Sequence, residues 1–152
     1  MQALVRRIQE NPKEEMAIKQ LISYLYAGEN FTRTYAAACF KQLGPLGKGA
    51  VPDLIVALDS GIGALEREAA LALGAIGPEA KNAVPALRRK VMLVDRDVGW
   101  FSADALASIG PEAMVAIEDL RRAEGLASPE WREFYTRAVL RLEAHRPKKS
   151  EQ

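Results

Sequence analysis

The breaker pair Gly-Pro recurs at a fixed interval, and this periodicity limits the fold more than any other feature of the sequence. Gly44-Pro45, Gly77-Pro78 and Gly110-Pro111 follow one another at a spacing of 33 residues, and one further step back reaches Asn11-Pro12. The residues six and ten positions after each breaker are the same in all four copies. They are Ala17, Ala50, Ala83 and Ala116, and Leu21, Leu54, Leu87 and Leu120. A period of this length predicts a protein built from stacked structural repeats.

Each repeat contains two helical patterns. The first, as in LEREAALALGAIG at 65–77, places apolar residues at helical spacing and adds a stripe of alanines that lets a neighbouring helix approach closely. The second, as in AVPDLIVALD at 50–59, has apolar residues at positions i, i+3, i+4 and i+7. Pro52 and Pro85 suit the first turn of this second helix, where the missing N–H needs no partner. No segment shows the sustained alternation of a β-strand. The sequence therefore predicts an all-α fold, an α-solenoid of stacked antiparallel helix pairs.

The segment Ile-Gly-Pro-Glu-Ala occurs twice, at 76–80 and 109–113, and raises the question of a phosphate-binding loop. Such a loop needs several glycines and a lysine followed by serine or threonine. Each copy here has one glycine and a proline, which has no N–H to donate. Glycine followed by proline is a common helix stop. We therefore interpret the segment as the turn between the two helices of a repeat, with Glu79 and Glu112 near the start of the second helix.

The periodicity predicts one domain, residues 1–146. The repeats are expected near 3–35, 36–68, 69–101 and 102–134, with a half-repeat at 135–146. A final helix at 130–145 is expected to cap the array. The first repeat fits least well, because Arg6 and Arg7 fall in columns that are apolar or small elsewhere, and a one-residue slip would explain this. Residues 147–152 are expected to form a disordered basic tail.

The composition excludes several classes of site. The chain has 21 basic and 20 acidic side chains and a net charge of +1, whereas a dedicated nucleic-acid binder usually has a much larger basic excess. Cys39 and His145 are the only cysteine and histidine, which excludes an internal disulfide and metal sites built from several of either residue. Cys39 falls in a column of alanines, which predicts a small buried residue, and His145 is expected to be solvated.

We expect neither catalysis nor a cofactor, and a cytoplasmic location. Glu66, Glu68, Asp95 and Asp97 lie at turns and helix starts, where helix capping explains acidic residues. The sequence has no apolar run of the ~18 residues that a membrane span needs and no apolar stretch of signal-peptide length near residue 1.

Two segments carry a family resemblance. EREAALALGAIGPEAKNAVPAL (66–87) and DRDVGWFSADALASIGPEA (95–113) resemble the short bacterial HEAT repeats, an armadillo-like type also found in phycobilin-lyase-like proteins. Ankyrin repeats share the period of 33, but their Thr-Pro-Leu-His motif is missing here. The paired aspartates of the HEAT pattern appear once, and its arginine column reads Arg33, Glu66, Gly99, Arg132. The resemblance implies a helical scaffold whose second helices line a concave face.

The second helices change in character along the array. One column reads Ile22, Ile55, Arg88, Arg121; the next reads Ser23, Val56, Arg89, Arg122; and the third reads Tyr24, Ala57, Lys90, Ala123. The ridge thus turns from apolar or neutral to basic. Two readings stay open: a solvated face that aids solubility, and a binding surface in which neighbouring Arg-Arg pairs grip carboxylates or phosphates. Trp100 is expected to be exposed and Trp131 to lie in the core.

We hypothesise from this pattern that the chain is a non-enzymatic scaffold that binds another protein with an acidic segment. The predicted partner-binding residues are Arg88, Arg89, Lys90, Arg121, Arg122, Tyr24 and Trp100. Two alternatives stay open: a nucleic-acid-binding HEAT-like protein, and an accessory subunit of a lyase-type complex. No membrane is expected as a partner, and the sequence does not determine the oligomeric state.

Overall fold

The computed structural model describes residues 1–145, and every regular element in this range is a helix, which confirms the predicted all-α class. The α-helices are α1 (Gln2–Glu10), α2 (Glu15–Ser23), α3 (Asn30–Leu43), α4 (Val51–Leu58), α5 (Gly63–Ile76), α6 (Val84–Val91), α7 (Asp97–Ile109), α8 (Ile117–Leu126) and α9 (Pro129–Glu143). The 3₁₀ helices are η1 (Tyr24–Tyr26), η2 (Gly44–Ala50), η3 (Gly77–Ala83) and η4 (Gly110–Ala116). The tail predicted at 147–152 lies outside the described residues.

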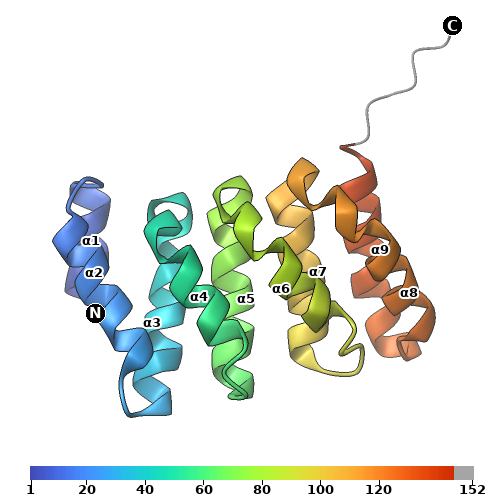
Figure 1. Cartoon of the computed structure of the whole chain (residues 1–152), viewed down its shortest axis with the longest axis horizontal. Helices are drawn as coiled ribbons and strands as arrows, with labels where there is room; N and C mark the ends of the chain where they lie inside the picture. Colours follow the sequence, from blue (N-terminus) through green and yellow to red (C-terminus); the bar gives the residue numbers. More distant parts are fainter. Residues whose placement is uncertain (146–152) are drawn as a thin grey trace, which may run out of the picture.

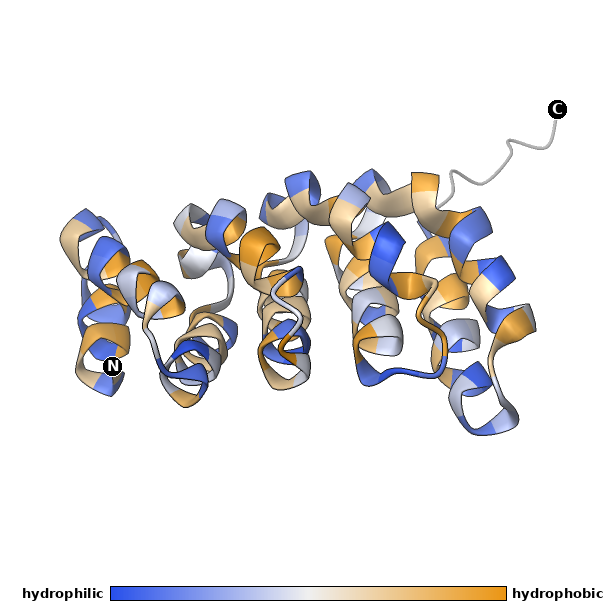
Figure 2. Cartoon of the chain, turned by 60° about the horizontal axis from the view of Figure 1, so that its bottom comes forward, coloured by the Kyte–Doolittle hydropathy of each residue, from blue (hydrophilic) through white to orange (hydrophobic). Residues whose placement is uncertain are grey.

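The helices follow one another along the long axis of the molecule in the order of the sequence (Figure 1). Neighbouring odd-numbered helices pack on each other, α3 on α5, α5 on α7 and α7 on α9. The helices α4, α6 and α8 each pack on the odd-numbered helix that follows, α5, α7 and α9, whereas α2 packs on α1, which precedes it. We call the odd-numbered helices the first-helix layer and α2, α4, α6 and α8 the second-helix layer. Each helix carries hydrophobic and hydrophilic residues (Figure 2), as a helix with one buried face does.

The alanine columns explain the close packing within the first-helix layer. Ala36, Ala69 and their neighbours Ala37 and Ala70 are fully buried where α3 meets α5. Between α5 and α7 the backbones also approach closely, because a Cβ added to Gly74 would lie 3.1 Å from the Cα of Ala105. The distance between two packed helices depends on the side chains at their contact. The small residues therefore set a tight spacing over α3, α5 and α7.

The first helix departs from this register, as the sequence suggested. The buried residues of α1 are Leu4, Val5 and Ile8, which have the same spacing as the buried Ala36, Ala37 and Phe40 of α3 but precede them by 32 residues instead of 33. Because of this slip, Leu4 and Val5 stand where α3 has two alanines. The helix α1 packs on α3 over a shorter stretch than α3 packs on α5.

The repeated Gly-Pro pair is a turn, as predicted. Gly44, Gly77 and Gly110 end α3, α5 and α7 with φ of 56°, 72° and 82° and with ψ near −135°. This backbone region is open almost only to glycine. Each glycine leads into a 3₁₀ helix, and Pro52 and Pro85 then lie in the first turns of α4 and α6.

The helix pairs do not begin at the boundaries that the periodicity suggested. The first helices start at Asn30, Gly63, Asp97 and Pro129, so boundaries at residues 36, 69, 102 and 135 would cut through α3, α5, α7 and α9. A period determines the length of a repeat but leaves its starting point free. The loops between helix pairs, which lack the regular Gly-Pro signal, hold the physical boundaries.

The arginine column serves the loop before each first helix. In α3 the Nε of Arg33 donates a hydrogen bond to the carbonyl of Leu25 at 2.9 Å, and in α9 the Nη2 of Arg132 donates to the carbonyl of Ala127 at 3.2 Å. Both acceptors lie in the turn that enters the helix. The arginine at this column position therefore holds the preceding turn against the helix, because it donates a hydrogen bond to a backbone carbonyl of that turn.

The two departures from arginine keep this role by other means. Glu66 accepts a hydrogen bond from the backbone N–H of Gly61 at 3.1 Å. Gly99 leaves room for Tyr135 of α9, whose hydroxyl lies 3.4 Å from the carbonyl oxygen of Val94 in the preceding turn. A Cβ on Gly99 would lie 2.6 Å from that hydroxyl. Glu66 and Gly99, which interrupt the arginine column, thus hold the equivalent turns by other contacts.

Candidate functional site

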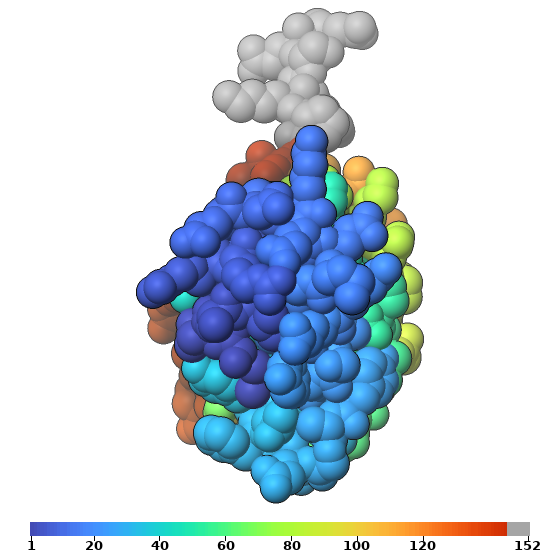
Figure 3. Space-filling model, turned by 90° about the vertical axis from the view of Figure 1, so that its left-hand side faces the viewer, coloured from blue at the N-terminus to red at the C-terminus, as the bar shows by residue number. Residues whose placement is uncertain are grey.

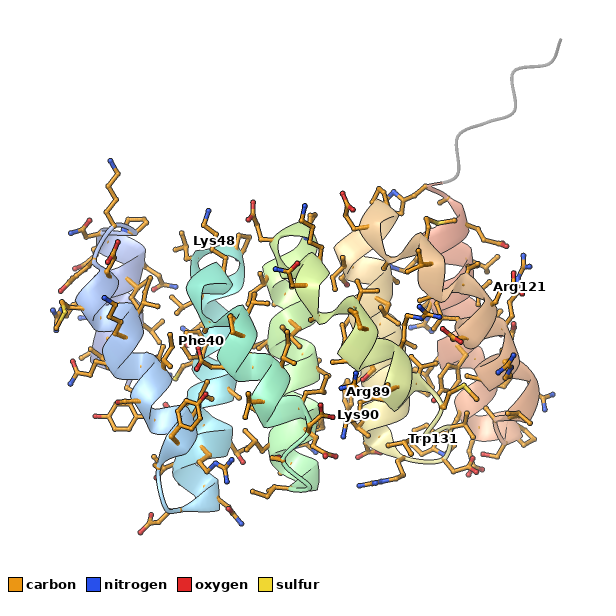
Figure 4. The ribbon with its side chains drawn as sticks, viewed as in Figure 1. Phe40, Lys48, Arg89, Lys90, Arg121 and Trp131 are labelled. Atoms are coloured by element: carbon orange, nitrogen blue, oxygen red, sulfur yellow. The ribbon has the colours of Figure 1, made fainter. Side chains whose placement is uncertain are left out.

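The basic residues predicted to form a ridge all lie in the second-helix layer, but they do not converge. Arg88, Arg89 and Lys90 occupy the last turn of α6, and Arg121 and Arg122 lie in α8. Figure 4 shows Arg89 and Lys90 together beside α5, whereas Arg121 lies at the outer end of the row. The structure therefore separates the two groups instead of placing them around one ligand position.

The α6 cations turn back toward the preceding helix pair, where carboxylates meet them. An Nη2 of Arg89 lies 2.9 Å from Asp59, the residue that follows α4. The Nζ of Lys90 lies 2.9 Å from Glu66 and 3.3 Å from Asp59. These ion pairs link α6 to the end of α4 and the start of α5.

The remaining ridge cations face the opposite end of the molecule. Arg88 pairs with Asp119 of α8 at 2.5 Å, and Arg121 pairs with Glu143 of α9. Arg122 is exposed and has no carboxylate partner among residues 1–145. Four of the five ridge cations are thus compensated by acids from neighbouring helices.

The ion pairs differ in how accessible they are to a partner. The side chain of Arg89 is 62% exposed and that of Asp59 is 42% exposed, and such pairs contribute only ~0.2–1 kcal/mol, so a partner's carboxylate can replace the internal one. Lys90 is 13% exposed and Glu66 is 3% exposed. Breaking a buried pair leaves an uncompensated charge, so Lys90 has a structural position instead of a binding one.

The two aromatic residues predicted at the site lie away from the arginines. Tyr24 is half-buried in η1, at the opposite end of the second-helix layer from α8. Trp100 lies in α7, in the first-helix layer, where its ring stacks on Phe134 at a centroid distance of 4.5 Å and faces Trp131 at 6.2 Å. Trp100 and Trp131 are both half-buried, so the predicted contrast between an exposed and a core tryptophan is wrong. Packing between α7 and α9 covers both rings partly.

A groove that the sequence did not single out lies in the second-helix layer near the other end of the row. It has a volume of about 780 Å³ and runs between α2 and η2. Its apolar lining comes from Pro12, Ile18, Ile22, Pro45 and Leu46. Lysines and glutamates line its rim: Lys13, Glu15, Lys19, Lys48 and Glu79.

The groove lies beside a column that is buried elsewhere in the chain. Ile18 occupies the column of Val51, Val84 and Ile117, which are all buried, yet Ile18 is half-buried. Its side chain lines the groove close to η2, since a Cβ added to Gly49 would lie 3.5 Å from Ile18. Figure 3 views the molecule from this end, which α1 and α2 largely cover.

Other candidate chemical groups lie outside any site. Cys39 is buried in α3 as predicted, and burial raises the pKa of its thiol. Asp97 begins α7 and Asp95 precedes it, but α7 has no capping hydrogen bond from a side chain. His145 is exposed, as expected. Among residues 1–145 no group of three or more potential ligand side chains is arranged to hold a metal ion.

Within the described range, no helix combines the length and the apolar character that crossing a bilayer requires. A search of protein-family models found no match to the sequence. A search of curated proteins likewise found no match.

Proposed function

We propose that the chain is a non-enzymatic α-solenoid of the HEAT type that binds a partner protein through its second-helix layer. The proposed array has four helix pairs, α1–α2, α3–α4, α5–α6 and α7–α8, and α9 as a half-repeat at its end. The shared columns of the sequence and the packing of α3, α5, α7 and α9 in order support this assignment. A solenoid of this kind presents an extended surface to a partner.

One observation carries the binding hypothesis: the second-helix layer leaves an apolar groove open at one end and accessible arginines at the other. The first-helix layer uses its small residues for packing between helices. Concave apolar surface with a few charged groups is the usual character of a binding site. The proposed binding surface also includes four exposed arginines that can exchange internal carboxylates for those of a partner: Arg88, Arg89, Arg121 and Arg122.

Nucleic-acid binding receives less support from the same side chains. Binding to a phosphate backbone requires several cations free to replace counterions. On the ridge, within the described residues, only Arg122 lacks a carboxylate partner. A partner protein that offers both apolar and acidic groups suits the layer better.

The proposal can be tested by affinity capture with the immobilised full chain and lysate from the source cells. The double variant Arg89/Arg122→Gln removes two exposed cations from the second-helix layer, and Arg67/Arg137→Gln removes two from the first-helix layer as a matched control. We expect the first variant to lose proteins that the wild type and the control retain. Equal capture by all three proteins would contradict a role for these two arginines in binding.

A further inference from the structure

We propose that the groove between α2 and η2 binds a helical segment of the partner protein that presents two neighbouring apolar side chains flanked by carboxylates. This inference rests on the proposed function and names the place and the chemistry of the contact. It differs from the sequence-based hypothesis, which assigned recognition to the arginines of α6 and α8.

The floor of the groove suits a helix. Ile18 and Ile22 lie one turn apart on α2, both half-buried, and Pro45 and Leu46 line the groove from η2. A helical segment inserts side chains at positions i and i+4 into a groove of this kind. A peptide in strand conformation would need an open sheet edge, and residues 1–145 contain no strand. The residues around the groove are therefore compatible with helix-in-groove recognition.

The rim favours an acidic partner. Lys13 precedes α2 and Lys48 lies in η2, so the groove has one lysine on each side. Both are exposed, and neither has a carboxylate partner within residues 1–145. Glu15 lies 3.8 Å from Lys19 and is compensated by it. Two free lysines on opposite sides attract carboxylates on both flanks of an apolar pair and set its orientation.

The charge state of the rim distinguishes this groove from the arginine ridge. On the ridge, the acids of neighbouring helices already neutralise Arg88, Arg89 and Arg121. At the groove no carboxylate lies within ion-pair distance of Lys13 or Lys48 among residues 1–145, and Figure 4 shows Lys48 on η2. Glu79 also lines the groove, so the three lysines of the rim exceed its two glutamates by one charge. Attraction of an acidic segment costs no internal ion pair here.

Gly49 offers a way to close the groove without changing its charge. It is exposed in η2, its φ is not positive, and a Cβ added to it would lie at an ordinary contact distance of 3.5 Å from Ile18. The substitution Gly49→Leu therefore fills the groove from its own wall. Gly125→Leu is the matched control, because Gly125 is exposed in α8 and a Cβ there meets nothing within 4 Å.

The experiment uses a displayed library of random linear peptides, selected on the full chain and measured individually by fluorescence polarisation. We expect enriched peptides to carry two apolar residues at helical spacing with Asp or Glu on both sides. Their affinity should fall about tenfold or more in Gly49→Leu and in Lys13/Lys48→Glu, and should stay unchanged in Gly125→Leu. Thermal unfolding followed by circular dichroism should show that all three variants are folded.

Three results would overturn the inference. No enriched peptide family, or a family without acidic residues, would exclude the proposed chemistry. Peptides that bind Gly49→Leu as well as the wild type but lose affinity for Arg89/Arg122→Gln would move recognition to the ridge and leave the proposed function standing. A dimer in solution that Gly49→Leu converts to a monomer would assign the groove to a second copy of the chain. Failure of both the peptide selection and the lysate capture would contradict the proposed function as well.

Discussion

The two ends of the second-helix layer differ in how far carboxylates of the chain compensate their cations. At α6 and α8 the layer is rich in arginine, and acids from α5, α8 and α9, together with Asp59 after α4, compensate nearly every cation. At α2 and η2 it has fewer cations and an apolar groove, yet Lys13 and Lys48 are free of carboxylates. A count of basic residues along the columns favours α6 and α8 as the binding region. The positive charge that is available to a partner lies at α2 and η2.

This contrast shows that the charge of a surface depends on what the fold brings beside each side chain. Asp59 and Glu66 are far from the α6 arginines in the sequence columns, but the stacking of helix pairs places them within ion-pair distance of Arg89 and Lys90. Along the ridge, ion pairs link α6 and α8 to neighbouring segments. At the groove, Lys13 and Lys48 form no such ion pair among residues 1–145.

The largest effect on stability is expected when Glu66, the buried acid that pairs with Lys90, is replaced. Glu66→Gln keeps the size of the side chain but leaves Lys90, which is 13% exposed, without its nearest carboxylate. We expect the free energy of unfolding to fall by ~2 kcal/mol, less than for a buried charge left with no partner, because Asp59 at 3.3 Å still compensates Lys90. Urea denaturation measures this loss. Glu133→Gln is the control, since its pair with Arg137 is exposed; equal effects of both variants would mean that the ridge has no buried internal compensation.

A second prediction compares the packing of the two ends. In Gly99→Ala the new Cβ would lie 2.3 Å from the carbonyl oxygen of Leu93 and 2.6 Å from the Tyr135 hydroxyl, so the backbone or α9 must shift. We expect destabilisation of about 1–3 kcal/mol. Gly49→Ala, in the open groove, should change stability by no more than about 0.5 kcal/mol. Similar values for the two variants in denaturant titrations would contradict the difference in packing.

A third prediction concerns the pH dependence of stability. Burial raises the pKa of Tyr135 from 10.0 to about 12, with a smaller contribution from Asp95. The folded state therefore holds this proton after the unfolded state has released it, and stability is lost as the pH rises from about 10 to about 12. At about pH 11 the loss should be ~1.4 kcal/mol.

The absorbance of tyrosinate can test this assignment directly. The chain has four tyrosines, and the pKa of the exposed Tyr26 is also raised, mainly because its hydroxyl donates a hydrogen bond to Asp53. We expect the last component of the titration to disappear in Tyr135→Phe and to persist in Tyr26→Phe. Persistence of that component in Tyr135→Phe would show that Tyr135 is not the buried group.

A small effect on stability is expected at the exposed ion pairs of the ridge. Asp59→Asn and Asp119→Asn remove the partners of Arg89 and Arg88, and each should cost no more than about 1 kcal/mol. The double variant would free both arginines and make the ridge resemble the groove in available charge. It should bind acidic peptides more tightly than the wild type at low salt, and unchanged binding would mean that internal compensation does not limit the ridge.

Much of the fold could be predicted from residue patterns, because each periodic column has residues of similar size and polarity that are buried in the same way. The buried columns Ala37, Ala70, Ala103 and Phe40, Leu73, Leu106 have the positions that helical periodicity indicated. The Gly-Pro turns were also predictable, since the positive φ at Gly77 is a local demand of the backbone. The groove had a partial signal in the sequence, because Ile22 and Ile55 differ from the arginines of their column, but the columns alone do not show that Ile22 borders a groove.

By itself, the sequence determined the elements of this protein: helices in pairs, breakers at a constant interval, and small residues where the first helices meet. These depend on local backbone preferences and on apolar periodicity, which act over a few residues. Packing of the helices was needed to show which charges are free, that Gly99 makes room for Tyr135, and that a groove lies between α2 and η2. Those properties depend on distances between side chains from different helices, and a change of one residue in register, as at Leu4 and Val5, is enough to alter them.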